Sequence, residues 1–464
     1  MPIAKCQLQI GSFGVAVVAL LSACVGCSSY SDRLSTVRDE FVVGNLAEAE
    51  EAIDKGMRRR CDRDVLALDK AVVQLAAGKP REAEATLREL RDRFDEREHA
   101  LADGKALSMF TDAQTKTYGG EDHEKVLIRT LLCLSNLMHD GGDALAYSLQ
   151  MTEKQQQIID AARDKDGENP KAAYKHVAVG PYLHGAIRAQ SHGNFDDVER
   201  ACVAVCSWQP EFEFAEQDLQ RARWGKHSEP GHGVVYVVTL VGVGPHKEEV
   251  AEVPSTVSLL IADRILSAIG DQTLPPTIAP VMVPKMVRTE HEVGCIGVSV
   301  DGFAAGHTAT ITDVGRMAIE QHEAVYPQLV AEAIVRRVVK KGTIYGAKTA
   351  LGVEKHSWQS LLFDVAGVIW EATESADTRS WGLLPDKIQV LRLELPAGTH
   401  QLGFQSQPLQ GKWPLGRSVA KQIEVTDGGT TFVLGNFPYG NLTGEILVSG
   451  HTGSQPGPVL HSSP

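Results

Sequence analysis

Two histidine–glutamate pairs come nearest to a catalytic motif in this sequence. The pairs at 123–124 and 322–323 begin like the H-E-x-x-H zinc motif, in which two histidines four residues apart share one helix face. Leu127 and Tyr326 stand where the second histidine would be required. Both pairs are therefore expected to be helix-surface or capping residues. The sequence predicts no metal site and no cofactor.

Other nucleophile motifs are also incomplete. Asp301 follows Ser299 where a Gly-x-Ser-x-Gly nucleophile turn needs a glycine. Cys202 and Cys206 stand four residues apart, without the histidine cluster that would complete a zinc site. The chain has neither a phosphate-binding loop nor a dinucleotide fingerprint. We therefore expect a protein that is not an enzyme. An enzyme remains the alternative, because catalytic triads are defined by geometry and not by spacing.

Cys24 has the clearest predicted chemistry. Residues 10–23 form an apolar stretch of about 14 residues that ends in small side chains, as in a secretory signal peptide. The string Leu-Ser-Ala-Cys that ends at Cys24 resembles the lipobox of bacterial lipoproteins, in which the thiol is acylated. We predict a lipoprotein signal peptide over 1–23, lipidation of Cys24 and an anchor linker over 24–33. The alternative is a plain secretory signal with an incidental cysteine.

A lipidated Cys24 would place the protein in the cell envelope. Two or three acyl chains anchor a protein stably, since each buried CH₂ contributes roughly 0.8 kcal/mol. Val25 is not the aspartate that retains lipoproteins in the inner membrane of enteric bacteria. The expected location is therefore the outer membrane, facing the periplasm.

The composition limits the partners. The chain has 464 residues, of which 43% are apolar and 23% charged, as in ordinary globular proteins. Its 46 basic and 59 acidic side chains give a formal net charge of −13, which argues against nucleic acid as a partner. Eight cysteines are too few for a dense disulfide framework in a chain of this length. The length predicts more than one domain.

The amino-terminal half has a helical pattern with an internal repeat. Residues 34–226 contain few prolines, and apolar residues recur there at three- and four-residue spacing. Two segments align with an offset of 34 residues, the period of tetratricopeptide repeats (TPR), and two weaker copies follow. We expect a TPR-like α-solenoid, with an unrelated helical bundle as the alternative. The repeat predicts turns, close helix contacts and a helix stop at six positions: Gly44, Ala49, Gly78, Ala83, Gly193 and Pro210.

The carboxy-terminal half changes to strand-forming patterns after a polar, Gly/Pro-containing break at 227–233. Strand and helix patterns are mixed at first, and alternating apolar residues with hairpin turns follow. The expected fold class is therefore α+β and multidomain. Its expected parts are a mixed α/β domain over 234–387, a small β-sandwich over 388–449 and a disordered tail over 450–464.

One short motif joins the mixed and β regions. Its characteristic residues are Asp377, Thr378, Arg379, Trp381 and Pro385. An aspartate two residues before an arginine, beside a tryptophan and a proline, suits a rigid corner in which the aspartate caps backbone amides and the arginine binds a carboxylate or carbonyls. A binding role is the alternative.

The lipobox, the degenerate repeats and several short strings together resemble an uncharacterised family of bacterial TPR-containing lipoproteins. These strings lie at 118–124, 244–247, 377–381 and 395–398. The resemblance covers nearly the whole mature chain and implies its architecture and envelope location. It implies no reaction, because that family has no established activity.

These observations lead to one functional hypothesis and one alternative. The chain is expected to be a lipid-anchored envelope protein that binds or assembles other proteins through its TPR-like repeats, because such repeats present a concave binding surface. The solenoid could equally be a spacer or pack against its own chain. The alternative function is an envelope hydrolase acting on glycan or peptide, with its site between the helical and α/β domains.

Replacing Cys24 with serine is expected to abolish metabolic labelling with a fatty acid and to release the protein from membranes, because serine lacks the acylated thiol. The matched control is Cys27→Ser. A lipobox has an aliphatic residue three positions before the acylated cysteine, and Cys27 has Cys24 at that position. Labelling that survives Cys24→Ser, or that is lost with Cys27→Ser instead, would contradict the assignment.

Overall fold

The computed structural model describes most of the chain. The described residues are 30–104, 117–163, 167–269, 274, 278–350, 376–411 and 413–449. The expected signal peptide, Cys24 and the expected tail at 450–464 lie outside them. The fold class is α+β, with an amino-terminal helical region followed by mixed β-sheets with interspersed helices.

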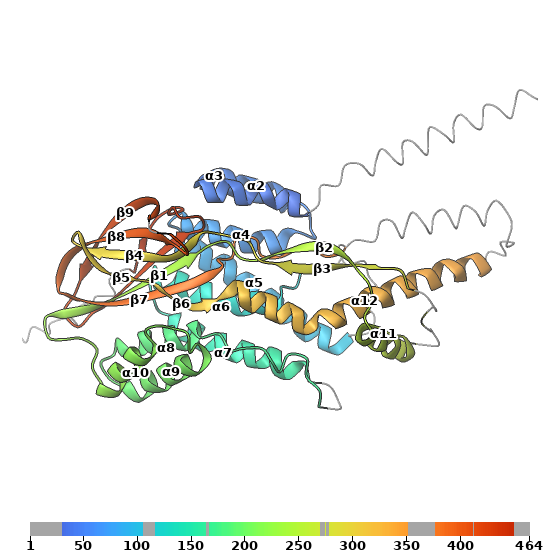
Figure 1. The fold of residues 1–464 in the computed structure, drawn as a ribbon, viewed down its shortest axis with the longest axis horizontal. Helices are drawn as coiled ribbons and strands as arrows, with labels where there is room; N and C mark the ends of the chain where they lie inside the picture. Colours follow the sequence, from blue (N-terminus) through green and yellow to red (C-terminus); the bar gives the residue numbers. More distant parts are fainter. Residues whose placement is uncertain are drawn as a thin grey trace, which may run out of the picture.

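Nine helices lie in the described part of the amino-terminal region, and each packs against its neighbour in the sequence. Apolar side chains at helical spacing explain this packing, as in α4, where Val65, Leu68 and Val72 are all buried. Figure 1 shows these helices beside the β-sheets. Their bounds are α2 Tyr30–Val43, α3 Leu46–Gly56, α4 Arg63–Ala76, α5 Pro80–Gly104, α6 Asp122–Leu137, α7 Ala144–Ala161, α8 Val179–Ala189, α9 Phe195–Trp208 and α10 Ala215–Trp224.

The two aligned repeat segments have the same local structure. Gly44 lies between α2 and α3 with φ 91°, and Gly78 lies between α4 and α5 with φ 77°. These are left-handed conformations that glycine adopts without steric cost. Ala49 and Ala83 are both fully buried, where a small side chain lets neighbouring helices approach closely.

The turn between α8 and α9 is built differently. Gly193 lies in this turn, but the left-handed residues are its neighbours His192 and Asn194, with φ of 51° and 56°. Asparagine tolerates this conformation better than most residues do. Pro210 follows two positions after the last residue of α9, Trp208, where proline cannot continue the helix.

The first sheet has five strands in the order β11-β10-β1-β7-β6. β1 (His232–Val241) lies at its centre, parallel to β10 (Thr430–Phe437) and antiparallel to β7 (Lys387–Pro396). β6 (Ala309–Asp313) and β11 (Leu447–Val448) form its edges. β1 belongs to the expected mixed domain, whereas β10 and nearly all of β7 belong to the expected β-sandwich region. Because β1 pairs with both strands, the expected boundary at residue 388 divides one sheet.

The second sheet has four strands and packs on the first. Its order is β5 (Phe303–His307), β4 (Val293–Val300), β8 (Gly398–Pro408) and β9 (Leu415–Val425). Apolar side chains of the two sheets form one shared core. The strands expected to form a separate β-sandwich at 388–449 therefore share both sheets and their core with strands from 234–387.

β1 is buried on both faces, which gives the body three layers (Figure 1). Val234, Tyr236 and Val238 belong to the core shared with the helices. Val235 and Val237 belong to the core shared with the second sheet. This alternation is the two-residue period of a strand, and it explains why the strand is apolar throughout.

A third, smaller core lies in an arm that extends from the body (Figure 1). It contains the β2–β3 ribbon, β2 being His246–Glu252 and β3 Val281–Val287, together with α11 (Thr256–Ile269) and part of α12 (Val314–Ala350). In the portion of the chain that the structure describes, we find no helix that is both long and apolar enough to cross a membrane.

Candidate functional site

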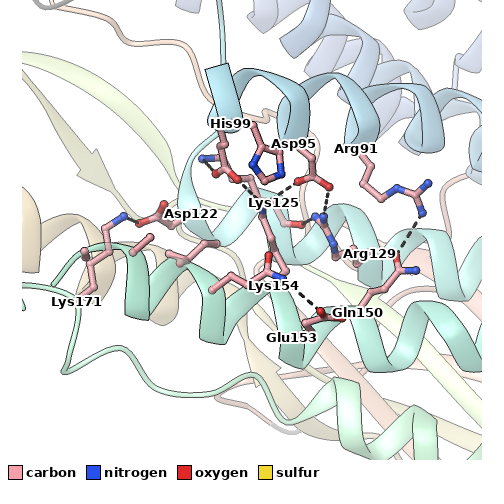
Figure 2. A pocket seen from close by; sticks show the side chains of 15 residues that line it. Arg91, Asp95, His99, Asp122, Lys125, Arg129, Gln150, Glu153, Lys154 and Lys171 are labelled. Atoms are coloured by element: carbon pink, nitrogen blue, oxygen red, sulfur yellow. Dashed lines mark hydrogen bonds and ion pairs between the residues drawn. The ribbon is translucent and has the colours of Figure 1, made fainter. Parts of the chain in front are cut away.

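A wide cleft lies among α5, α6 and α7 (Figure 2). Its volume is about 830 Å³. Most of the side chains on its walls are charged, and both signs are present in similar numbers. The charged residues are Arg91, Asp95, Glu98, Asp122, Lys125, Arg129, Glu153, Lys154 and Lys171.

Ion pairs across the three helices form the base of the cleft. The Lys154 ammonium on α7 lies 2.7 Å from an Asp95 oxygen on α5, and it also pairs with Glu98. The Arg129 guanidinium on α6 lies 2.6 Å from the other Asp95 oxygen. Lys125, one turn earlier on α6, lies 2.6 Å from Glu98. Each carboxylate thus joins two helices, and the charges come from positions far apart in the sequence.

These pairs keep the cleft carboxylates ionised. Burial alone would raise the pKa of Asp95, but Lys154 and Arg129 outweigh it and hold that pKa below its usual range. The pKa of Glu98 is likewise lowered, because Lys125 and Lys154 outweigh its burial. A general acid at neutral pH needs a raised pKa. Neither carboxylate is therefore suited to protonate a leaving group.

The rim of the cleft has partly exposed polar side chains. Lys171 lies 2.6 Å from Asp122. The Arg91 guanidinium lies 5.8 Å from the centre of the Tyr147 ring and donates to the Gln150 side chain at 3.3 Å. Figure 2 shows these groups around the opening. A ligand could exchange hydrogen bonds with them and leave the ion pairs at the base intact.

The two histidine–glutamate pairs lie in α6 and α12. His123, Glu124 and His322 are buried, so the expected helix-surface position is wrong for these three residues. The expected capping role is confirmed for Glu124, which accepts from the Glu121 amide at the start of α6. His322 contacts the Pro284 carbonyl at 3.0 Å. No group of three or more metal-ligating side chains occurs among the described residues.

Burial raises the pKa of the Cys202 thiol to about 12, so this cysteine is not a reactive thiolate.

The motif at 377–385 lies between the helices and the sheets. Arg379 pairs with Asp377, with a shortest distance of 2.5 Å, and donates to the Cys61 carbonyl at 2.7 Å. Trp381 and Pro385 are buried, and Thr378 is half-buried. The sequence predicted a rigid corner in which Asp377 caps backbone amides and Arg379 binds a carboxylate or carbonyls; that the carboxylate is Asp377 itself is a finding of the structure. The sequence did not identify the helices on which this corner packs.

Two buried carboxylates on those helices hold the backbone of the motif. Glu124 on α6 accepts a hydrogen bond from the Trp381 amide at 2.7 Å, and Asp69 on α4 accepts one from the Leu383 amide at 2.9 Å. We name residues 376–386 the docked segment. The sequence contained a sign of this role, because Asp69 stands in an otherwise apolar stretch of α4.

The two carboxylates differ in charge. The second Glu124 oxygen accepts from the Tyr118 hydroxyl at 2.5 Å and from the Glu121 amide at 2.9 Å, so this carboxylate has several donors. Asp69 has a second oxygen with no partner among the described residues. Burial raises the pKa of Asp69 to about 8. Asp69 is therefore mainly protonated near neutral pH.

Asp69→Asn is expected to be nearly neutral at low pH and stabilising at high pH. The folded protein binds the Asp69 proton more tightly than the unfolded chain does, so this proton's contribution to stability is lost as pH rises from about 4 to about 8. Asparagine keeps an acceptor for Leu383 but does not titrate. Urea unfolding of both proteins at several pH values measures the effect.

Asp69→Ala is the matched comparison. It leaves the Leu383 amide without its acceptor, which is expected to lower the free energy of unfolding by about 1–3 kcal/mol. Equal stability of the Asn and Ala variants would show that the hydrogen bond to the docked segment contributes nothing.

Comparisons of this chain with models of protein families, with curated proteins and with solved structures give no match.

Proposed function

We propose that this chain is a lipid-anchored cell-envelope protein that binds or assembles other proteins through its helical region and catalyses no reaction. The lipobox at Cys24 supports the anchor, and the outer membrane facing the periplasm is the proposed location. The proposal extends to the finer fold of the amino-terminal region, in which the helices form a TPR-like solenoid. The 34-residue offset between Gly44 and Gly78 supports the solenoid.

The cleft among α5, α6 and α7 carries the functional proposal. Its walls present ammonium, guanidinium and carboxylate groups together. A polypeptide has side chains of both signs and backbone donors and acceptors, so it can match such a surface. A volume of about 830 Å³ is within the usual range for ligand sites and suits a few residues of a partner.

The docked segment supports the same conclusion. The helical region already receives an irregular stretch of its own chain, whose amides at Trp381 and Leu383 donate to carboxylates on α6 and α4. The surface that contacts the β-sheets is therefore occupied by the chain itself. A separate partner would bind at the open cleft.

The ion pairs also argue against the alternative function. A glycosidase needs one carboxyl group that is protonated and one that is ionised. Asp95 and Glu98 both have lowered pKa values and both pair with Lys154. We therefore do not propose a hydrolase at this cleft.

A photo-crosslinking residue in place of Gln157 is expected to give a discrete protein adduct in intact envelopes, because Gln157 lines the cleft and is exposed. The matched control is Gln156, its exposed neighbour on α7, which does not line the cleft. Mass spectrometry of purified adducts identifies the partner.

Adducts of equal yield at Gln156 and Gln157 would indicate random collision and contradict a binding cleft. No adduct at Gln157, with the protein present at its normal level in the membrane fraction, would also count against the proposal.

A further inference from the structure

A second cavity is lined by residues of α10, β5 and β7, together with Phe214 just before α10. Its volume is about 270 Å³, enough for a small molecule but not for a folded partner. Charged and apolar residues both line it. They include Phe214, Arg221, His307, Leu391 and Arg392.

Two arginines enter this cavity from different elements. Arg221 on α10 donates through one terminal nitrogen to Asp218 at 2.9 Å. Arg392 on β7 donates through one terminal nitrogen to the His227 carbonyl at 2.6 Å. The Nε atoms of both arginines are buried and have no partner among the described residues. Each guanidinium thus retains hydrogen-bond donors that the protein does not use.

Arg392 has one long ion pair. Its partner is Glu394 at 3.7 Å, two residues along the same strand, and only 13% of the Arg392 side chain is exposed. Arg221, in contrast, pairs with Asp218 at 2.9 Å. A nearly buried cation is costly unless an anion compensates it. The geometry therefore leaves room for one negative charge beside Arg392.

An apolar wall, formed by Phe214 and Leu391, completes the cavity. A separate narrow space nearby is lined by Asp218, Arg221 and Tyr182, whose hydroxyl is buried and has no partner among the described residues. Guanidinium groups bind carboxylates and phosphates through paired hydrogen bonds. A small molecule with one anionic and one apolar end matches these features.

We propose that this cavity binds a small organic oxyanion, a carboxylate or phosphate, whose charged group lies between the guanidinium groups of Arg221 and Arg392. Its apolar part contacts Phe214 and Leu391. This site is separate from the cleft among α5, α6 and α7, so either proposal can fail without the other.

Calorimetric titration of the full chain with inorganic phosphate and with butyrate, against chloride at equal ionic strength, tests the site. At least one of the two anions is expected to bind, and the one that binds identifies the charged group. Arg392→Gln is expected to weaken binding at least about tenfold, because it removes one of the two guanidinium groups proposed to hold the anion. Arg223→Gln is the matched control, since Arg223 lies on α10 two residues after Arg221 and pairs with Glu199 at the surface.

Arg392→Lys keeps the positive charge but lacks the planar guanidinium group that makes paired hydrogen bonds, so it is expected to bind the anion with intermediate affinity. This variant tests the site if Arg392→Gln does not fold. Binding of neither anion to the wild-type chain would overturn the proposal. Equal affinity of the wild type and the folded Arg392→Gln or Arg392→Lys variant would overturn it as well.

Discussion

The hydrogen bonds from the docked segment to Glu124 and Asp69 are the contacts on which the rest of the arrangement depends. They fix an irregular stretch of backbone with a turn at 382–383 against α6 and α4, and the same stretch leads directly into β7. Because β7 pairs with the central strand β1, the position of the helices relative to both sheets follows from these contacts. Buried backbone amides need acceptors, which explains the two acids in this otherwise apolar interface.

The chain uses buried charge in two ways. At the docked segment, Glu124 has several donors, whereas Asp69 avoids the cost of a buried charge by keeping its proton. In the cleft, Asp95 and Glu98 stay ionised because Lys154 contacts both. The first arrangement joins two halves of one chain. The second keeps charged groups near a surface that remains open to a partner.

Several features follow from sequence pattern alone. Glycines 34 residues apart predicted the turns at Gly44 and Gly78, because only the local backbone conformation is at stake there. Alternating apolar residues predicted strands in the carboxy-terminal half. The boundary at 388 could not be placed correctly from pattern, because the pairing of β1 with β7 and β10 joins residues that are far apart in the sequence.

The sequence by itself indicated the helical and strand-forming regions and predicted the lipidation of Cys24, since each depends on neighbouring residues. Only the tertiary structure decided that Glu124 binds the Trp381 backbone amide, and that Arg129 and Lys154 meet Asp95 in one cleft. The physical reason is distance along the chain. Hydrogen bonds and ion pairs between remote residues leave no periodic trace in a single sequence.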